Sequence, residues 1–263
     1  MSDAAIPVPE PPATTPFGPT DPAERIRAID ILRGLALFGI LAANMRGFFA
    51  PEVVYFNPLT LFKGTADVVA QYLIEYLIQG KFVTLFSFLF GVGFAVQISR
   101  AMDQGRSIRF YPRRLLILLG FGLIHGLLIW WGDILLGYAV GGFALLLFRK
   151  RKQKTVAIWG LALFLLPLLG MVGFTIAIAL GHGPSSGGGF GPSPASEATI
   201  RSAIAAYRGG VVEHMGQNMR DWARANAPVL PIVLVFVLPR FLAGLWVWRT
   251  GLFRNLEEHA PTV

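Results

Sequence analysis

The chain has 263 residues, of which 54% are hydrophobic and only 14% charged, and its formal net charge is +8. Its mean hydropathy of +0.58 is too high for an ordinary soluble domain, so the composition predicts a multi-pass membrane protein. The basic residues flank the apolar segments, which favours membrane lipids over nucleic acid as the partner of the positive charge. The sequence has no cysteine, which excludes disulfides, thiolate metal sites and a cysteine nucleophile.

The order of apolar segments predicts an all-α, multi-pass transmembrane helical bundle of about six spans, between residues 25 and 250. Seven prolines within residues 1–24 predict a disordered tail before it. A short tail, 251–263, follows the last span. The six predicted spans are 31–49, 82–99, 115–131, 134–148, 156–180 and 229–248.

Arginine and lysine cluster before the first span, between the second and third, and after the fourth. The positive-inside rule therefore predicts a plasma-membrane protein with both termini in the cytoplasm. The loop 181–228 then lies outside; it begins with a Gly/Pro/Ser linker and continues into an amphipathic stretch at 197–225. This stretch and residues 67–79 are each predicted to form an interfacial or lid-like helix, or else a loosely ordered connector.

His125 is the only histidine inside a predicted span. An imidazole can act as an acid or a base near neutral pH, but a lone histidine can also simply pack against a neighbour. Gly122 and Gly126 form a G-x-x-x-G pattern around it, for which close helix packing is the favoured explanation. Asp133 lies eight residues further on, about 12 Å away along a continuous helix. It reaches His125 only if the chain turns back at Gly132; capping the next helix is the alternative.

Charged residues also gather at the predicted cytoplasmic end. Asp30 and Arg33 are one helical turn apart, and Arg113 and Arg114 open the third span. A structural ion pair with topology-setting arginines is the simplest interpretation, and an anion site is the alternative, since guanidinium groups suit phosphates.

Two polar positions are less easily explained. Arg240 lies near the middle of the last span, directly after Pro239, so it requires a partner from another helix or from a ligand, unless it snorkels. Asn44 and Arg46 form a polar cluster at the outer end of the first span, for which snorkelling to the headgroups is the alternative to a functional role.

Three motifs resemble the YeiB family of bacterial membrane proteins over about residues 25–148, and FLAGLWVWRTGLF resembles it more weakly. They are RIRAIDILRGLALFGILAANM, KFVTLFSFLFGVGFA and RRLLILLGFGLIHGLLIWWGDILLGYAVGG. That family is grouped with transmembrane acyltransferases similar to heparan-alpha-glucosaminide N-acetyltransferase. The resemblance implies transfer of an acyl group from cytoplasmic acyl-CoA to an acceptor at the outer face of a bacterial inner membrane. It also implies further helices, supplied by a homo-oligomer or by complementing C-terminal helices.

On this hypothesis the cationic cluster binds the nucleotide phosphates of acyl-CoA, with no metal involved. Its members are Arg33 (paired with Asp30), Arg113 and Arg114. His125 removes a proton from the acceptor, Asp133 orients the histidine or the acceptor, and Asn44 donates to the developing oxyanion. Arg114 and His125 are eleven residues apart, or about 16 Å of helix, which is comparable to an extended pantetheine arm.

Two other functions fit the same residues. A small-molecule or lipid exporter would use Arg240, Asp133 and His125 as a substrate path, although no internal repeat is visible in the sequence. A structural or assembly subunit would use 197–225 as a docking surface.

Overall fold

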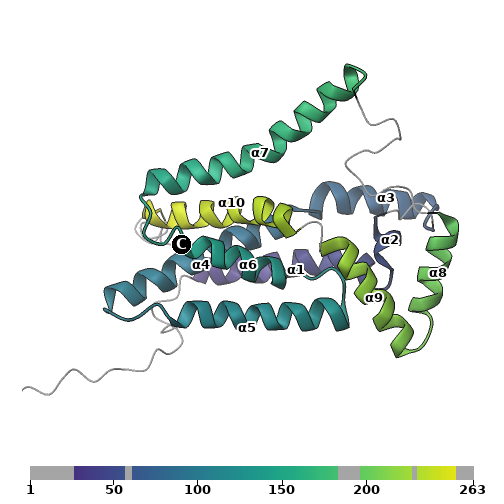
Figure 1. Cartoon of the computed structure of the whole chain (residues 1–263), viewed down its shortest axis with the longest axis horizontal. Coiled ribbons are helices and arrows are strands. Elements are labelled where there is room, and N and C mark those ends of the chain that lie inside the picture. The colour runs from purple at the N-terminus through teal and green to yellow at the C-terminus, as the bar shows by residue number, and fades with distance from the viewer. Residues whose placement is uncertain (1–26, 57–60, 183–195, 227–229, 253–263) are drawn as a thin grey trace, which may run out of the picture.

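The computed structural model describes residues 27–56, 61–182, 196–226 and 230–252, and every regular element in these ranges is helical (Figure 1). The predicted all-α bundle is therefore confirmed. The α-helices are α1 (Arg27–Phe48), α2 (Glu52–Tyr55), α3 (Thr65–Leu73), α4 (Lys81–Asp103), α5 (Phe110–Ile124), α6 (Leu135–Leu146), α7 (Gln153–Ala179), α8 (Glu197–Tyr207), α9 (Val211–Asn226) and α10 (Leu230–Arg249). Two π-helical segments, η3 (Ile74–Ile78) and η4 (His125–Ile129), continue α3 and α5.

Four helical segments of the described chain are long and apolar enough to cross a membrane. They are Ala28–Phe48, Thr65–Asp103, Phe110–Ile129 and Gln153–Ala179, and they include four of the six predicted spans except for at most two residues at one end. The fourth predicted span corresponds to α6, which has only 12 residues. That is about 18 Å of helix, well short of a hydrocarbon layer of about 30 Å. The sixth predicted span corresponds to α10, which is not among these four segments. The total of six crossings therefore stays a prediction.

The bundle is built around α10, which packs against α4, α6 and α7. Glycines bring α10 and α4 into backbone contact: a Cβ added to Gly244 would lie 2.8 Å from the Val92 nitrogen and would overlap the Phe88 carbonyl oxygen. A Cβ on Gly91 would similarly overlap the Phe241 carbonyl. Gly91 in the second span therefore serves close packing.

Side chains from other elements satisfy the backbone groups that helix ends leave open. In the turn that follows α6, Arg249 donates to the carbonyls of Phe148, Arg149 and Arg151 at 3.2, 2.7 and 2.7 Å. At the end of α1, the indole of Trp130 donates to the Gly47 carbonyl at 2.8 Å. These bonds hold sequence-distant helix ends together.

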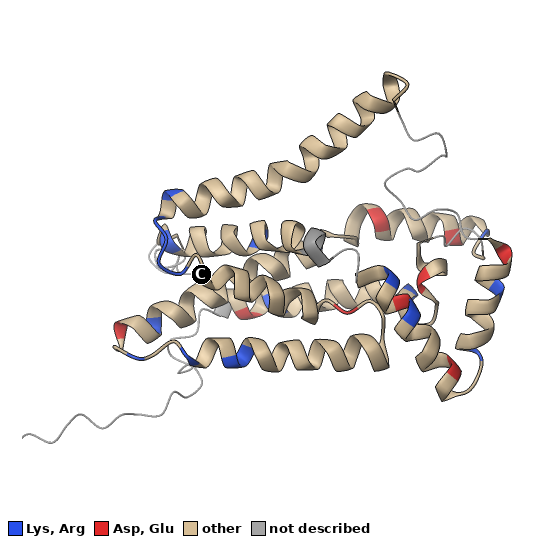
Figure 2. Cartoon of the chain, viewed as in Figure 1, with Lys and Arg blue, Asp and Glu red and all other residues tan. Residues whose placement is uncertain are grey.

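Basic side chains collect at one end of the bundle, on the left of Figure 2, around the α4–α5 and α6–α7 connections. At the opposite end, α2, α8 and α9 form a small helical unit, here called the cap, around Val54, Ile200 and Ala203. The stretch 197–225 thus forms two packed helices, and residues 67–79 are also mainly helical. The Pro-rich tail predicted at 1–24 lies outside the described residues.

One helix stands apart from the rest. In Figure 1, α7 leans away from α10 along its length, and Val156 is its only buried residue. The remaining side chains of α7 therefore leave a broad apolar surface uncovered.

Candidate functional site

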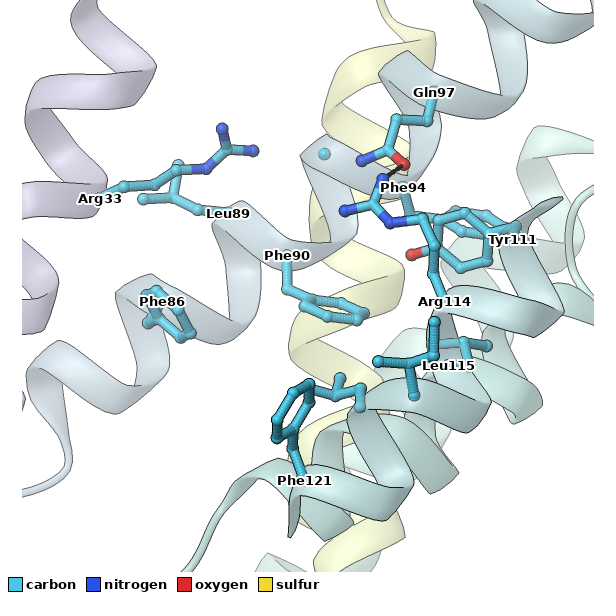
Figure 3. Close-up of a pocket in the computed structure, with 13 residues that line it drawn as sticks. Arg33, Phe86, Leu89, Phe90, Phe94, Gln97, Tyr111, Arg114, Leu115 and Phe121 are labelled. Atoms are coloured by element: carbon cyan, nitrogen blue, oxygen red, sulfur yellow. Dashed lines mark hydrogen bonds between the residues drawn. The ribbon is translucent and has the colours of Figure 1, made fainter. Parts of the chain in front are cut away.

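A cavity of about 570 Å³ lies between α1, α4 and α5 (Figure 3). Its size falls within the range of about 300–1,000 Å³ that is typical of small-molecule sites. The cavity is lined by Arg33, Phe86, Leu89, Phe90, Gly93, Phe94, Gln97, Tyr111, Arg114, Leu115, Ile117, Leu118 and Phe121.

Two arginines define one end of this cavity. Arg33 reaches in from α1 and Arg114 from α5, and in Figure 3 their guanidinium groups point toward one another across α4. Gln97 of α4 accepts a hydrogen bond from Nη1 of Arg114. Gly93 makes room for Arg33, because an added Cβ would lie 2.6 Å from its Nη2. Two converging guanidinium groups favour a phosphate or another anion as ligand.

The rest of the wall is apolar. Phe86, Phe90 and Phe94 follow one another at intervals of four residues along α4, so they form one stripe. Phe121 faces them from α5, seven residues or about two turns beyond Arg114. The cavity therefore combines a cationic end with an aromatic body, which fits a ligand with an anionic head and a largely apolar or extended arm.

Further along α5, His125 and Asp133 meet. The Nδ1 atom of His125 lies 3.0 Å from Oδ1 of Asp133, whose side chain is fully buried, while the imidazole is 33% exposed. The Asp133 carboxylate also accepts from the backbone nitrogens of Leu135 at 3.2 Å and Leu136 at 2.9 Å. Asp133 thus makes both contacts that the sequence left open, since it is within hydrogen-bond distance of the histidine and also caps α6.

A break in the helix brings these two residues together. At His125 the α-helix widens into η4, and the chain leaves the helix at Trp130, which is extended with φ −155° and ψ 126°. A continuous helix would have kept His125 and Asp133 apart. Gly122 permits the return, because an added Cβ would lie 2.5 Å from the Leu136 nitrogen. The packing role predicted for this glycine is therefore confirmed.

The cap supplies residues to this region that the sequence does not identify. Asn218 of α9 donates from Nδ2 to the carbonyls of Gly126 and Leu127, both at 2.9 Å, which satisfies the open end of η4. Trp222 packs on Gly126, where an added Cβ would lie 2.6 Å from its Cδ1. The only sequence signal for these contacts is the amphipathic pattern of 197–225, which predicts a covering helix but not what it covers.

The cap also holds a buried carboxylate. Asp221 is fully buried and accepts from Gln217 Nε2 at 2.7 Å, the Tyr207 hydroxyl at 3.1 Å and the Glu52 backbone nitrogen at 3.2 Å. Burial raises its pKa above the ordinary value of 3.8, against the effect of these hydrogen bonds. Burial and the nearby Asp221 charge also raise the pKa of Glu52 above 4.5. The ionised forms of both groups are therefore disfavoured in the folded cap.

This pair makes the stability of the cap depend on pH. Folding raises the pKa of both carboxyl groups. Their contribution to the stability of the cap is therefore complete when the pH is below their ordinary pKa values, and it is lost as the pH rises through the raised pKa values. We expect Glu52→Gln to increase the amide-hydrogen protection of α9 at neutral pH and to flatten its decline with rising pH. Hydrogen exchange measured across a pH series checks this. Glu197→Gln, which changes an exposed carboxylate of the same cap, is the control, and equal protection in both variants would contradict the prediction.

The remaining predicted site residues lie elsewhere. Asp30 pairs with Arg33 at 3.3 Å on an exposed part of α1. Arg113 does not line the cavity, and Asn44 is half-buried on α1 with no hydrogen bond to another described residue, so the roles of both stay predictions. Arg240 lies in a second cavity, between α4, α7 and α10.

Comparisons with known proteins identify relatives over about half of the chain. YxaH of Bacillus subtilis, described as an uncharacterised protein, is 48% identical over 155 residues, covering 56% of this chain and 38% of YxaH. YeiB of Escherichia coli, also described as uncharacterised, is 39% identical over 120 residues, covering 45% of this chain and 30% of YeiB. A 39.9 kDa protein from Bacillus acidopullulyticus is 36% identical over 143 residues, covering 54% of this chain and 39% of that protein.

The chain therefore spans well under two thirds of the length of these relatives. No protein-family model matches it. No solved structure matches it either. Over the matched region, which covers about half of its length, the chain is related to the YeiB-like proteins, as its motifs predict.

Proposed function

We propose that this chain is an acyltransferase of the membrane, which takes an acyl group from acyl-CoA and passes it to an acceptor at the His125 end of α5. One observation carries the proposal: Arg33 and Arg114 converge at one end of an aromatic-lined cavity. His125 lies eleven residues beyond Arg114, or three turns and about 20° around the helix, so both face the same side of α5. The intervening length of about 16 Å matches an extended pantetheine arm.

In the proposed reaction the arginines hold the phosphates of the donor, and the aromatic wall holds its arm. The Nδ1–H group of His125 donates to Asp133, which leaves Nε2 free to accept a proton from a hydroxyl or amine of the acceptor. The acceptor then attacks the thioester carbonyl, and the carbon–sulfur bond breaks. The departing thiolate takes the proton from the imidazolium, so the products are the acylated acceptor and free CoA.

The charge distribution supports a direction for this transfer. The two cavity arginines lie near the N-terminal ends of α1 and α5. Basic side chains collect at the end of the bundle where the α4–α5 connection lies (Figure 2). The positive-inside rule would make that end cytoplasmic. We therefore place acyl-CoA entry on the cytoplasmic side of a bacterial inner membrane and acceptor binding beneath the cap, on the outer side. Both termini are then cytoplasmic.

The absence of cysteine allows a direct test, because a thiol reagent added to the protein reports only released CoA. We expect proteoliposomes to release thiol from acyl-CoA when a thiol-free lipid extract of membranes is added as the acceptor, with acyl chains varied in length. Arg33→Gln and Arg114→Gln should each raise the KM for acyl-CoA about tenfold or more, since each removes a charge-assisted hydrogen bond. Arg113→Gln removes the adjacent charge, which does not line the cavity, and is the matched control.

Two results would reject the proposal. One is a wild-type chain that releases no CoA from any donor in the series. The other is an identical rise in KM for Arg113→Gln and Arg114→Gln, which would attribute the effect to general surface charge.

A further inference from the structure

A second cavity, of about 560 Å³, lies on the other side of α4, between α4, α7 and α10. Its α7 wall includes Leu161 and Phe164, whose side chains are 60% and 51% exposed. Because these α7 side chains are exposed, we describe the cavity as a groove at the surface of the bundle. In Figure 1, α7 leans away from α10. None of the acyl-transfer residues proposed above lines it.

A single cation lies within this apolar groove. Arg240 is ten residues after the start of α10 and nine before its end, so about 14–15 Å of helix separates it from each terminus. Its Nε donates to Thr84 Oγ1 at 2.9 Å, and its Nη1 donates to the Phe236 carbonyl. Both acceptors are neutral, and no carboxylate of the described chain pairs with Arg240.

A charge inside an apolar groove is costly unless it is paired. The guanidinium has five donors, and the two contacts above use only two of its nitrogens. The groove around it therefore offers a positive charge, unused donors and a long apolar wall that includes Phe88 and Trp246. Charge complementarity selects a ligand with one anionic head and one apolar chain.

We propose that this groove binds the carboxylate of a long-chain fatty acid, with the head at Arg240 and the chain between α7 and α10. The apolar lining of the site favours a carboxylic acid over a phospholipid. A carboxyl group can enter the hydrocarbon layer as the neutral acid and ionise when it reaches the guanidinium, whereas a phosphodiester keeps its charge throughout. The guanidinium and carboxylate then form a charge-assisted hydrogen-bonded pair.

The groove can be closed without changing its charge. Gly160 of α7 lines the cavity, and a Cβ added there would lie 3.5 Å from Leu242 Cβ and 3.9 Å from the Pro239 carbonyl oxygen. These are ordinary contact distances, so the first carbon of a larger side chain fits. The rest of a leucine side chain would occupy the groove.

Native mass spectrometry of the full chain with added oleate tests the proposal, together with photocrosslinking by a diazirine-bearing palmitate. We expect oleate adducts on the wild type, and crosslinks in peptides of α7 and α10. Arg240→Gln should lower oleate occupancy about tenfold or more, through loss of a charge-assisted hydrogen bond. Gly160→Leu should lower it comparably with the arginine in place, while Arg240→Lys should retain part of it.

Arg201→Gln is the matched control, because it removes one exposed arginine of α8 and leaves the groove unchanged. Equal oleate occupancy in wild type, Arg240→Gln and Gly160→Leu would overturn the proposal. Crosslinks confined to helices other than α7 and α10 would also overturn it. The same holds if phosphatidylglycerol or oleyl alcohol displaces the bound fatty acid as effectively as added oleate does. None of these measurements requires acyl-CoA turnover, so the result is independent of the proposed acyl transfer.

Discussion

Replacing His125 with alanine is expected to lower the turnover of acyl transfer by roughly 10²–10⁴-fold, the usual contribution of a general acid–base group. The KM for acyl-CoA should stay close to that of the wild type. The reason is geometric, since the imidazole lies at the far end of α5 from the arginines proposed to hold the donor. Thiol release from proteoliposomes over a range of acyl-CoA concentrations separates the two parameters.

Asp133→Asn tests whether the carboxylate acts through the histidine. An asparagine retains one oxygen for the α6 backbone nitrogens but can no longer fix the imidazole as a charged acceptor does. We expect a fall in turnover at an unchanged KM, accompanied by a smaller loss of thermal stability than in Asp133→Ala. His182→Ala, at an exposed histidine beyond α7, should leave turnover unchanged. A His125→Ala variant with wild-type turnover would remove the histidine from the mechanism.

Replacing Gly244 with alanine is expected to destabilise the whole bundle, because this glycine allows α10 and α4 to make backbone contact. An added Cβ would meet the Phe88 carbonyl and the Val92 nitrogen, neither of which can move without displacing α4. Overpacking of this kind costs about 1–3 kcal/mol. We therefore expect a clearly lowered Tm in detergent, which can be measured by intrinsic tryptophan fluorescence.

Gly120→Ala is the matched control for this substitution. Gly120 lies on α5, and an added Cβ there has no heavy atom of another element within 4 Å. Alanine is the better helix former, so the control should be neutral or slightly stabilised. A Gly244→Ala variant with the Tm of the control would show that the two helices can separate at little cost.

The spacing of apolar residues predicts most of the bundle, because a helix in lipid must satisfy its own backbone and therefore leaves a long apolar run. The same rule says less about α6, whose short run forms a helix that is tied to its neighbours by Asp133 at one end and Arg249 at the other. Those two contacts join residues from different elements. A pattern read along one segment cannot reveal them.

The sequence predicts which residues belong to the candidate site better than it predicts how they are arranged. Helical periodicity argued against a contact between His125 and Asp133, and the contact exists because the chain becomes extended at Trp130. The sequence identified Arg113 and Arg114 together, but adjacent residues lie about 100° apart on a helix, so only packing decides which one faces α4. For Asn218 the sequence offers only the amphipathic pattern of 197–225, which does not identify its partners, because these are backbone carbonyls.

The π-helical turn that begins at His125 sets how this region tolerates change. A π turn accommodates one residue more than an α turn, so deleting a residue from Gly126–Ile129 would restore ordinary helical winding. The five residues of η4 and four residues of ordinary α-helix turn the chain by about the same angle, so the segment after the deletion would keep roughly its present orientation. The Trp130 indole would stay near the Gly47 carbonyl, and Asp133 near the imidazole. This turn can therefore lose one residue at less cost than an ordinary turn of α5, where a deletion rotates everything that follows.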